Sequence, residues 1–359
     1  MNMLVSGDNA TNSILTEFTN NVNDQYLAPA DFDQYYEALA YDTYLMDYDE
    51  DNDVFFNDLT DNNYGQSQQK TINKSGYINE YVFSVAANFN HKFYLGATLG
   101  IHDLYYEEET DLLEYDAKNN IDYFNSLNFL TNVNTSGTGF NFKLGAIYKP
   151  TNELRLGVAI HTPTFYKLHD AYENTMLSNM TFDGKTEDYS AISPWGEYDY
   201  KLETPLRAIF SAAYVIGKKG LISVDYEYVD YSTAKLREGG NYNYQFSSEN
   251  GDIAEAYKPV GNIHIGGEYR LTNNVSLRAG YEKYPSAFNA NAFNSAQLNS
   301  DADYSAVSAG LGIKQGNFYI DMAYKHGMNE EYNNLYSGSD FAKYEVQNDN
   351  FIMTLGVKF

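Results

Sequence analysis

Several residue types and patterns are scarce in this chain of 359 residues. It has no cysteine, one tryptophan and seven prolines. It also has no uninterrupted apolar run approaching the roughly 18 residues of a membrane-spanning helix, which excludes a helical membrane protein. The lack of cysteine is compatible with passage through an oxidising compartment. At this length the chain can form two ordinary domains or one large all-β domain.

Basic residues are scarce relative to acidic ones. The chain has 23 Lys and Arg against 49 Asp and Glu, which gives a formal net charge of −26. This balance argues against a nucleic acid partner, because nucleic acids select basic surfaces. The acidic residues gather in stretches such as Asp47–Asp53 and Glu107–Glu109. We interpret these stretches as solvated loops, and the alternative is that divalent cations bridge them to anionic lipopolysaccharide.

Aromatic residues, in contrast, are abundant. The chain has 36 Tyr and 21 Phe, yet its mean hydropathy is −0.52. Alternation of apolar and polar residues explains the combination, and the last ten residues show it: Phe351, Met353, Leu355, Val357 and Phe359 occupy every second position. Period two predicts a β-strand. An amphipathic strand that ends on a terminal Phe is typical of bacterial outer-membrane β-barrels, so Phe359 is the predicted signal for the barrel-assembly machinery.

The same alternation recurs from residue 76 onward in hairpins with short turns, and long polar loops separate the hairpins. Short connections on one side and long ones on the other are typical of outer-membrane barrels, with the long loops outside the cell. The sequence therefore predicts an all-β fold, a transmembrane antiparallel β-barrel over residues 76–359. Its eleven predicted strands are about 77–89, 92–105, 139–149, 153–167, 204–216, 220–231, 260–271, 274–284, 304–314, 317–327 and 347–359.

Residues 1–75 lack this alternation, and they are predicted to form an acidic extracellular loop region with short helices at 12–23 and 30–46. The first ten residues have neither the basic start nor the apolar stretch of a signal peptide. Bacterial single-chain barrels have an even number of strands. An odd count of eleven therefore leads us to expect that the N-terminal part is missing.

Residues 137–168, GTGFNFKLGAIYKPTNELRLGVAIHTPTFYKL, resemble the FadL family of outer-membrane transporters of long-chain fatty acids and hydrocarbons. Segments 204–232, 263–284 and 319–327 support the resemblance, which is strongest to the Bacteroidetes-type branch often named hemin receptor. The resemblance implies a fourteen-stranded barrel with an N-terminal hatch, of which the hatch and the first three strands are absent here. It also implies passive uptake of long-chain fatty acids or other hydrophobic small molecules at the bacterial outer membrane.

Polar residues on the opposite parity to the apolar ones are predicted to face the barrel lumen, because a charge facing lipid at the midplane costs roughly 2–4 kcal/mol. Five of them are candidates to bind a ligand, since Arg in particular pairs with a carboxylate through two hydrogen bonds. The alternative is that the lumen charges pair with one another and stiffen the wall. The five candidates are Lys143, Arg155, His161, Arg207 and Arg278, and the wider lumen set adds Glu80, His102, Asp225, Glu227, His264, Glu268, Arg270, Glu282, Asp321 and Lys325.

Apolar residues in two predicted loops are candidates for a capture groove at the outer surface, which the resemblance implies. The alternative is that they pack only on one another. They are Phe124, Leu127, Phe129 and Leu130 in one loop, and Phe288 and Phe293 in the other.

The six histidines show no short ligand spacing, so we predict no metal, no heme and no other cofactor. The sequence offers no catalytic residues, and we expect a non-enzymatic transporter. One alternative is a non-transporting surface barrel whose acidic loops mediate adhesion or partner binding. A lipid hydrolase in the barrel wall is the least supported class, because the strand histidines point mostly inward.

Overall fold

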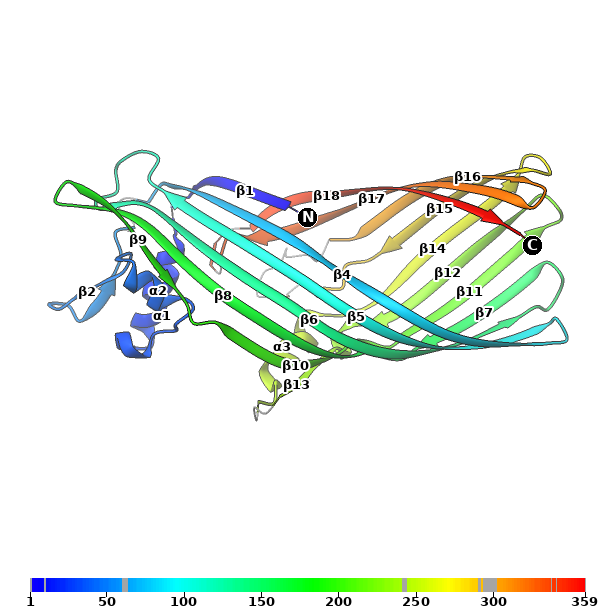
Figure 1. Ribbon diagram of the computed structural model, residues 1–359, viewed down its shortest axis with the longest axis horizontal. Coiled ribbons are helices and arrows are strands. Elements are labelled where there is room, and N and C mark those ends of the chain that lie inside the picture. The colour runs from blue at the N-terminus through cyan, green and yellow to red at the C-terminus, as the bar shows by residue number, and fades with distance from the viewer. Residues whose placement is uncertain are drawn as a thin grey trace.

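The computed structural model describes residues 2–9, 11–59, 64–240, 244–289, 292, 302–336, 338–339 and 341–358. Within them, sixteen strands form one antiparallel sheet in an elongated molecule (Figure 1). The sheet strands are β1 Asn2–Asn9, β4 Gln66–Phe89, β5 Phe93–Tyr115, β6 Phe124–Tyr148, β7 Leu154–His161, β8 Phe165–Phe182, β9 Lys185–Ile192, β10 Gly196–Glu203, β11 Arg207–Ile216, β12 Gly220–Asp230, β13 Lys235–Glu238, β14 Pro259–Arg270, β15 Val275–Tyr284, β16 Tyr304–Gln315, β17 Phe318–Asn334 and β18 Phe341–Val357.

The remaining elements are short. They are the helices α1 Ile14–Asp24, α2 Glu37–Asp42 and α3 Ser247–Ala256, two 3-10 turns at Pro29–Asp31 and Tyr231–Thr233, and the two-stranded sheet of β2 Asp47–Asp49 and β3 Val54–Phe56. Among the described residues, no helix is long and apolar enough to cross a membrane.

Short turns gather at one end of the sheet, together with the C-terminus (Figure 1). The β4–β5 turn contains Asn90 and His91, both with positive φ, a geometry that suits a tight hairpin and that Asn tolerates well. We call the strand ends nearest these turns the turn-side wall. It comprises residues 77–104, 138–161, 207–229, 261–283, 306–327 and 348–357.

The opposite end carries α1, α2, β2 and the β8–β9 hairpin (Figure 1). We call this end the distal part, and it comprises residues 11–59, 66–75, 107–136, 168–192 and 329–336. The hydrophobic core of the described residues lies here. It joins Leu15 and Val22 of α1 to Phe124 of β6 and Met176 of β8.

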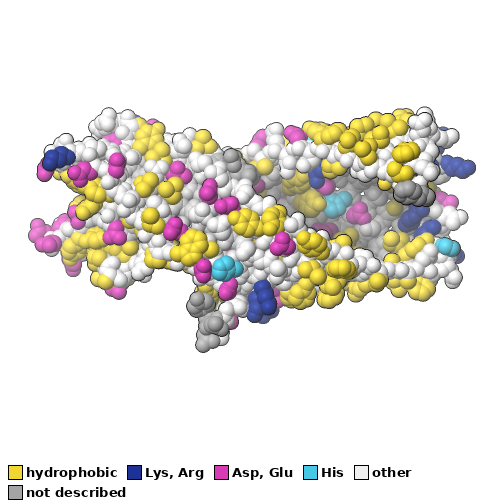
Figure 2. All heavy atoms as spheres, in the orientation of Figure 1, with side chains coloured by type: hydrophobic (Ala, Val, Ile, Leu, Met, Phe, Trp, Pro, Cys, Tyr) yellow, Lys and Arg dark blue, Asp and Glu magenta, His cyan; other side chains and the backbone are white. Residues whose placement is uncertain are grey.

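The sheet has two edges along the turn-side wall. β1 pairs only with Gln66–Asn73 of β4. The rest of β4 therefore has β5 as its single described neighbour, and β18 has only β17. The space-filling surface is hollowed along this region, and charged side chains are visible inside (Figure 2).

Several predicted boundaries are wrong. β4, β5, β6, β17 and β18 extend well beyond the predicted strands into the distal part. The predicted strand 153–167 is two strands, β7 and β8, and the predicted loop after it contains most of β8 together with β9 and β10. These distal strands pack one face on the core or face solvent on both sides, so they lack the regular apolar alternation that lipid imposes on the turn-side wall.

The loop prediction for residues 1–75 is also wrong in part, because β1, β2, β3 and the start of β4 lie there. A helix does occupy most of 12–23, where Ser13 caps α1 by accepting a hydrogen bond from Leu15 N. The predicted helix 30–46 is instead a 3-10 turn followed by the short α2. Asp33 interrupts it, because its side chain accepts a hydrogen bond from Tyr35 N at 2.8 Å and so competes with helical hydrogen bonding.

Candidate functional site

Three of the predicted ligand-binding residues of the lumen lie side by side on neighbouring strands. Lys143 of β6 is opposite His161 of β7, and His161 is opposite Arg207 of β11. The register also places them on the face opposite to Leu144 and Ile160, which are exposed apolar residues. The strand pleat therefore lines up Lys143, His161 and Arg207 across three strands of the turn-side wall.

Lys143 is already paired. Its Nζ lies 2.5 Å from Oε1 of Glu80, and Nε2 of His102 lies 3.4 Å from the same oxygen. The amide of Asn141 lies 2.9 Å from that His102 nitrogen. Gly100 makes room for the cluster, because a Cβ there would collide with the Glu80 carboxylate and lie 2.7 Å from Oδ1 of Asn141.

Arg278 is held between two carboxylates. Its Nε donates to Glu268 at 2.8 Å, and its Nη1 donates to Asp321. A glycine again makes the approach possible, since a Cβ at Gly312 would lie 2.7 Å from Oδ1 of Asp321 and 3.2 Å from Nη2 of Arg278. The guanidinium is therefore charge-compensated within the wall.

Arg207 and Arg155 differ from this pattern. Arg207 lies 3.9 Å from Glu227, whose other carboxylate oxygen accepts a hydrogen bond from Asn262 at 2.8 Å. Arg155 forms no ion pair with any residue that the structure describes. Of the five ligand-binding candidates, the two arginines on β7 and β11 are thus the least compensated.

The loop residues proposed for capture lie elsewhere than predicted. Phe124, Leu127, Phe129 and Leu130 belong to strand β6, not to a loop. The first three are buried in the distal core, because α1 and α2 cover this part of the strand. They therefore do not form an open groove.

The remaining capture and assembly residues fall partly outside the described ranges. Phe288 lies between β15 and β16, with its ring centroid 4.9 Å from that of Tyr257. Phe293 and the terminal Phe359 lie outside the described residues.

A cavity of about 610 Å³ lies where α1 and α2 meet β4, β5 and β6, and we call it the distal cavity. One group of lining residues is apolar: Ile14, Phe18, Leu112, Phe129 and Leu335. The other group is charged: Glu17, Glu37, Lys70 and Glu108. The cavity also contains Asn21, Thr110 and Thr131, so its lining is mixed, and such a combination of apolar side chains with polar groups can hold a small molecule.

Lys70 was not expected at a site, because Gln66–Asn73 reads as polar sequence with no alternation. In the structure its Nζ donates to the backbone oxygen of Asn334 at 3.1 Å. Burial lowers the pKa of Lys70 from its ordinary value. The only sequence signal was its charge within an otherwise uncharged stretch, and that signal does not predict burial.

Glu114 of β5 attaches α1 to the sheet and was also unexpected. This fully buried carboxylate accepts hydrogen bonds from Ser13 Oγ at 2.6 Å, Ile14 N at 3.0 Å and Gln68 Nε2 at 2.9 Å. Burial raises the pKa of Glu114 to about 7. The start of α1 is therefore fixed to the strands that line the distal cavity.

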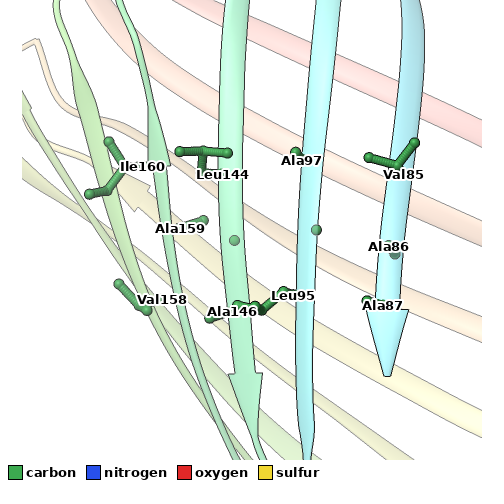
Figure 3. A pocket seen from close by; sticks show the side chains of 12 residues that line it. Val85, Ala86, Ala87, Leu95, Ala97, Leu144, Ala146, Val158, Ala159 and Ile160 are labelled. Carbon is green, nitrogen blue, oxygen red and sulfur yellow. The ribbon is translucent and has the colours of Figure 1, made fainter. Parts of the chain in front are cut away.

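A second depression of about 560 Å³ lies in the wall of β4, β5, β6 and β7 (Figure 3). Its side chains include Val85, Leu144 and Ile160, which register places on one face and which are 73%, 61% and 48% exposed. These large apolar groups face away from the lumen charges. The depression therefore lies on the face of the wall that is predicted to meet lipid.

Comparison with known proteins agrees with this architecture. Residues 59–358 match the model of the family described as outer membrane protein transport protein (OMPP1/FadL/TodX). No curated protein matches the chain.

Solved structures that match the chain include the following three. The CymD monoaromatic hydrocarbon channel is 14% identical, with 82% of this chain and 83% of that chain covered and a TM-score of 0.47. The P. putida toluene transporter TodX is 14% identical, with 82% and 71% covered and a TM-score of 0.48. The Ralstonia pickettii toluene transporter TbuX is 12% identical, with 84% of each chain covered and a TM-score of 0.46.

The family match extends over most of the chain and includes the segments on which the resemblance was predicted. The predicted family and the predicted outer-membrane location are confirmed. The chain therefore belongs to the OMPP1/FadL/TodX family of outer membrane transport proteins.

Proposed function

We propose that this chain mediates passive uptake of hydrophobic small molecules, long-chain fatty acids among them, across the outer membrane. The observation that carries the proposal is the distal cavity, which presents Phe18, Leu112 and Phe129 at the end of the molecule remote from the short turns. A hydrophobic molecule gains free energy by leaving water for such a surface. Family membership makes a transport role the natural use of that binding.

Within this proposal the lumen supplies the second contact. Lys143 and Arg278 have carboxylate partners at hydrogen-bond distance, so a fatty acid carboxylate would have to displace them. Arg155, which has no ion pair among the described residues, is the better anchor for a carboxylate. A neutral hydrocarbon would need no anchor at all.

The proposal also includes closure of the barrel by further strands. Among the residues that the structure describes, β4 and β18 each have an edge without a neighbouring strand on the turn-side wall, and exposed edges of this length invite pairing. The fourteen strands and the hatch implied by the resemblance remain predictions, as do the contacts with lipopolysaccharide and the barrel-assembly machinery.

Uptake of labelled oleate and of labelled toluene tests the proposal in cells that express the gene or lack it. We expect faster uptake of at least one probe in expressing cells. Arg155→Ala should lower oleate uptake, because a lost charged hydrogen bond costs roughly 1.5–3 kcal/mol, and it should leave toluene uptake unchanged. Arg237→Ala is the matched control, since Arg237 lies on β13 and pairs with Glu203 at 2.7 Å.

Equal uptake of both probes with and without the gene would sink the transport proposal. Equal oleate uptake by wild type and Arg155→Ala would instead remove Arg155 as the anchor.

A further inference from the structure

The distal cavity contains a carboxylate oxygen without a partner. Glu37 stands in the first turn of α2, is only 5% exposed and lines the cavity. Its Oε1 accepts a hydrogen bond from Asn21 Nδ2 at 2.5 Å. Its Oε2 is buried and forms no hydrogen bond with any residue that the structure describes. Buried polar atoms are normally paired, so this oxygen offers a place for a ligand donor.

The other charges around the cavity favour a cationic ligand. Glu17 and Glu108 line it together with Glu37, and Lys70 is the single basic residue in its lining. Lys70 is engaged with the backbone oxygen of Asn334, and Glu108 pairs with Lys74 at 3.1 Å. Because Lys74 compensates Glu108, Glu17 and Glu37 against Lys70 leave the cavity with a net negative charge, which attracts cations and repels anions.

Aromatic rings form the apolar side of the same cavity. The rings of Phe18 and Phe129 meet edge to face with centroids 6.0 Å apart, and the Tyr36 ring lies 6.0 Å from that of Phe129. These three residues all line the cavity. A ring or short chain can pack on them while its polar head reaches Glu37.

We propose that the distal cavity binds an amine with an apolar body, whose ammonium group donates a hydrogen bond to Oε2 of Glu37. The inference rests on the proposed function, because it takes this cavity as part of the uptake route. It adds which class of hydrophobic molecule binds in the cavity most tightly. A carboxylate of the same size would place its charge near those of Glu17 and Glu37. A fatty acid would therefore bind this cavity through its apolar chain alone, and more weakly than the amine.

Isothermal titration calorimetry on the full chain in detergent micelles tests this with three matched probes: 2-phenylethylamine, 2-phenylethanol and 3-phenylpropionate. We expect the amine to bind most tightly and the carboxylate most weakly. Glu37→Gln keeps an oxygen for Asn21 but removes the charge, and it should weaken amine binding by about tenfold or more, as for loss of a charged hydrogen bond. It should change the affinity for the alcohol much less.

The matched control is Glu109→Gln. It removes the same charge from the residue that follows Glu108 on β5. Glu109 is exposed and does not line the cavity, so its replacement should leave amine affinity unchanged. Equal affinities for the amine and the carboxylate in the native protein would overturn the inference. So would wild-type amine affinity in a folded Glu37→Gln protein, with folding checked by hydrogen exchange of α1 and α2.

Toluene uptake separates this inference from the proposed function. If the amine binds through Glu37 but neither toluene nor oleate enters cells faster than in the deletion strain, the site stands and the transport proposal fails. If uptake is intact and the amine ranking is absent, the inference alone fails.

Discussion

The distal part and the turn-side wall bury opposite kinds of side chain. In the distal part, Leu15, Phe124 and Met176 are inside, and most acidic residues other than Glu37 and Glu114 are at least partly exposed. In the turn-side wall, Val85 and Leu144 are exposed, while Glu80 and His102 face inward. One sheet runs through both regions, and β4, β5 and β6 each change from one arrangement to the other along their length.

The change follows the surroundings of each strand segment. Lipid on the outside of the turn-side wall makes exposed apolar residues favourable and forces charges to the lumen, where they pair. Water around the distal part restores the ordinary rule, and α1 and α2 then cover one face of the strands. The comparison shows that the same strands can serve as a membrane wall and as the floor of the distal cavity.

The largest expected effect comes from the distal core. Phe124 is 1% exposed, so Phe124→Ala should cost roughly 3–5 kcal/mol of the local free energy of unfolding. Hydrogen exchange of the α1 amides measures this loss. The matched truncation in the turn-side wall, Leu144→Ala, leaves no internal cavity and should have a much smaller effect. An equal loss of stability in both variants would contradict the conclusion that apolar side chains are buried in the distal part and exposed in the turn-side wall.

The next effect tests the inward and outward faces of the wall. Val224 and Ser223 are neighbours on β12, and Val224 is 43% exposed while Ser223 lines a lumen cavity. Val224→Arg should destabilise the protein by roughly 2–4 kcal/mol if it lies near the bilayer midplane. Ser223→Arg should cost clearly less. Urea unfolding in lipid vesicles, followed by Trp195 fluorescence, measures both, and the reverse order would invalidate the face assignment.

The third effect concerns pH and is confined to the distal part. The pKa of Glu114 is raised by burial to about 7, above its value in an unfolded chain, so the folded state binds the extra proton. Its stabilising contribution is therefore complete below about pH 4.5 and is lost as pH rises through 7. The change is at most on the order of 3 kcal/mol.

Hydrogen exchange of α1, corrected for the intrinsic exchange rate, should show this loss of protection between pH 4.5 and 7. Glu114→Gln cannot titrate and should abolish the pH dependence, whereas amides of β12 should show none in either protein. A pH dependence that persists in the variant would assign it to another group.

The alternation of apolar and polar residues predicted strands well only where lipid imposes that alternation. Residues 93–101 alternate strictly and lie in β5, and the hairpins of β11 with β12 and of β14 with β15 also fall close to the predicted ranges. Gln66–Asn73 and residues 168–203 do not alternate clearly, although both are largely strand. One face of such a strand packs on helices and the other meets water or another chain segment, so side-chain polarity does not reveal the period.

The candidate site, like the strands, could be predicted only in part from the sequence. Lumen parity identified Lys143, Arg207 and Arg278 as residues of one polar face, and the resemblance in 137–168 identified the family. Whether each cation is free or paired depends on residues far away in sequence, such as Glu80 for Lys143. No local pattern predicts such pairs.

The sequence by itself determined the strands of the turn-side wall and the family, because lipid imposes a two-residue period and the family segments are contiguous. Only the tertiary structure decided that Phe124 and Phe129 are buried beneath α1 and that Glu37 and Lys70 share a cavity. Those contacts join α1 and α2 to β4 and β6, which come later in the chain. Burial and pairing arise from how distant segments pack together, so they appear only once the chain has folded.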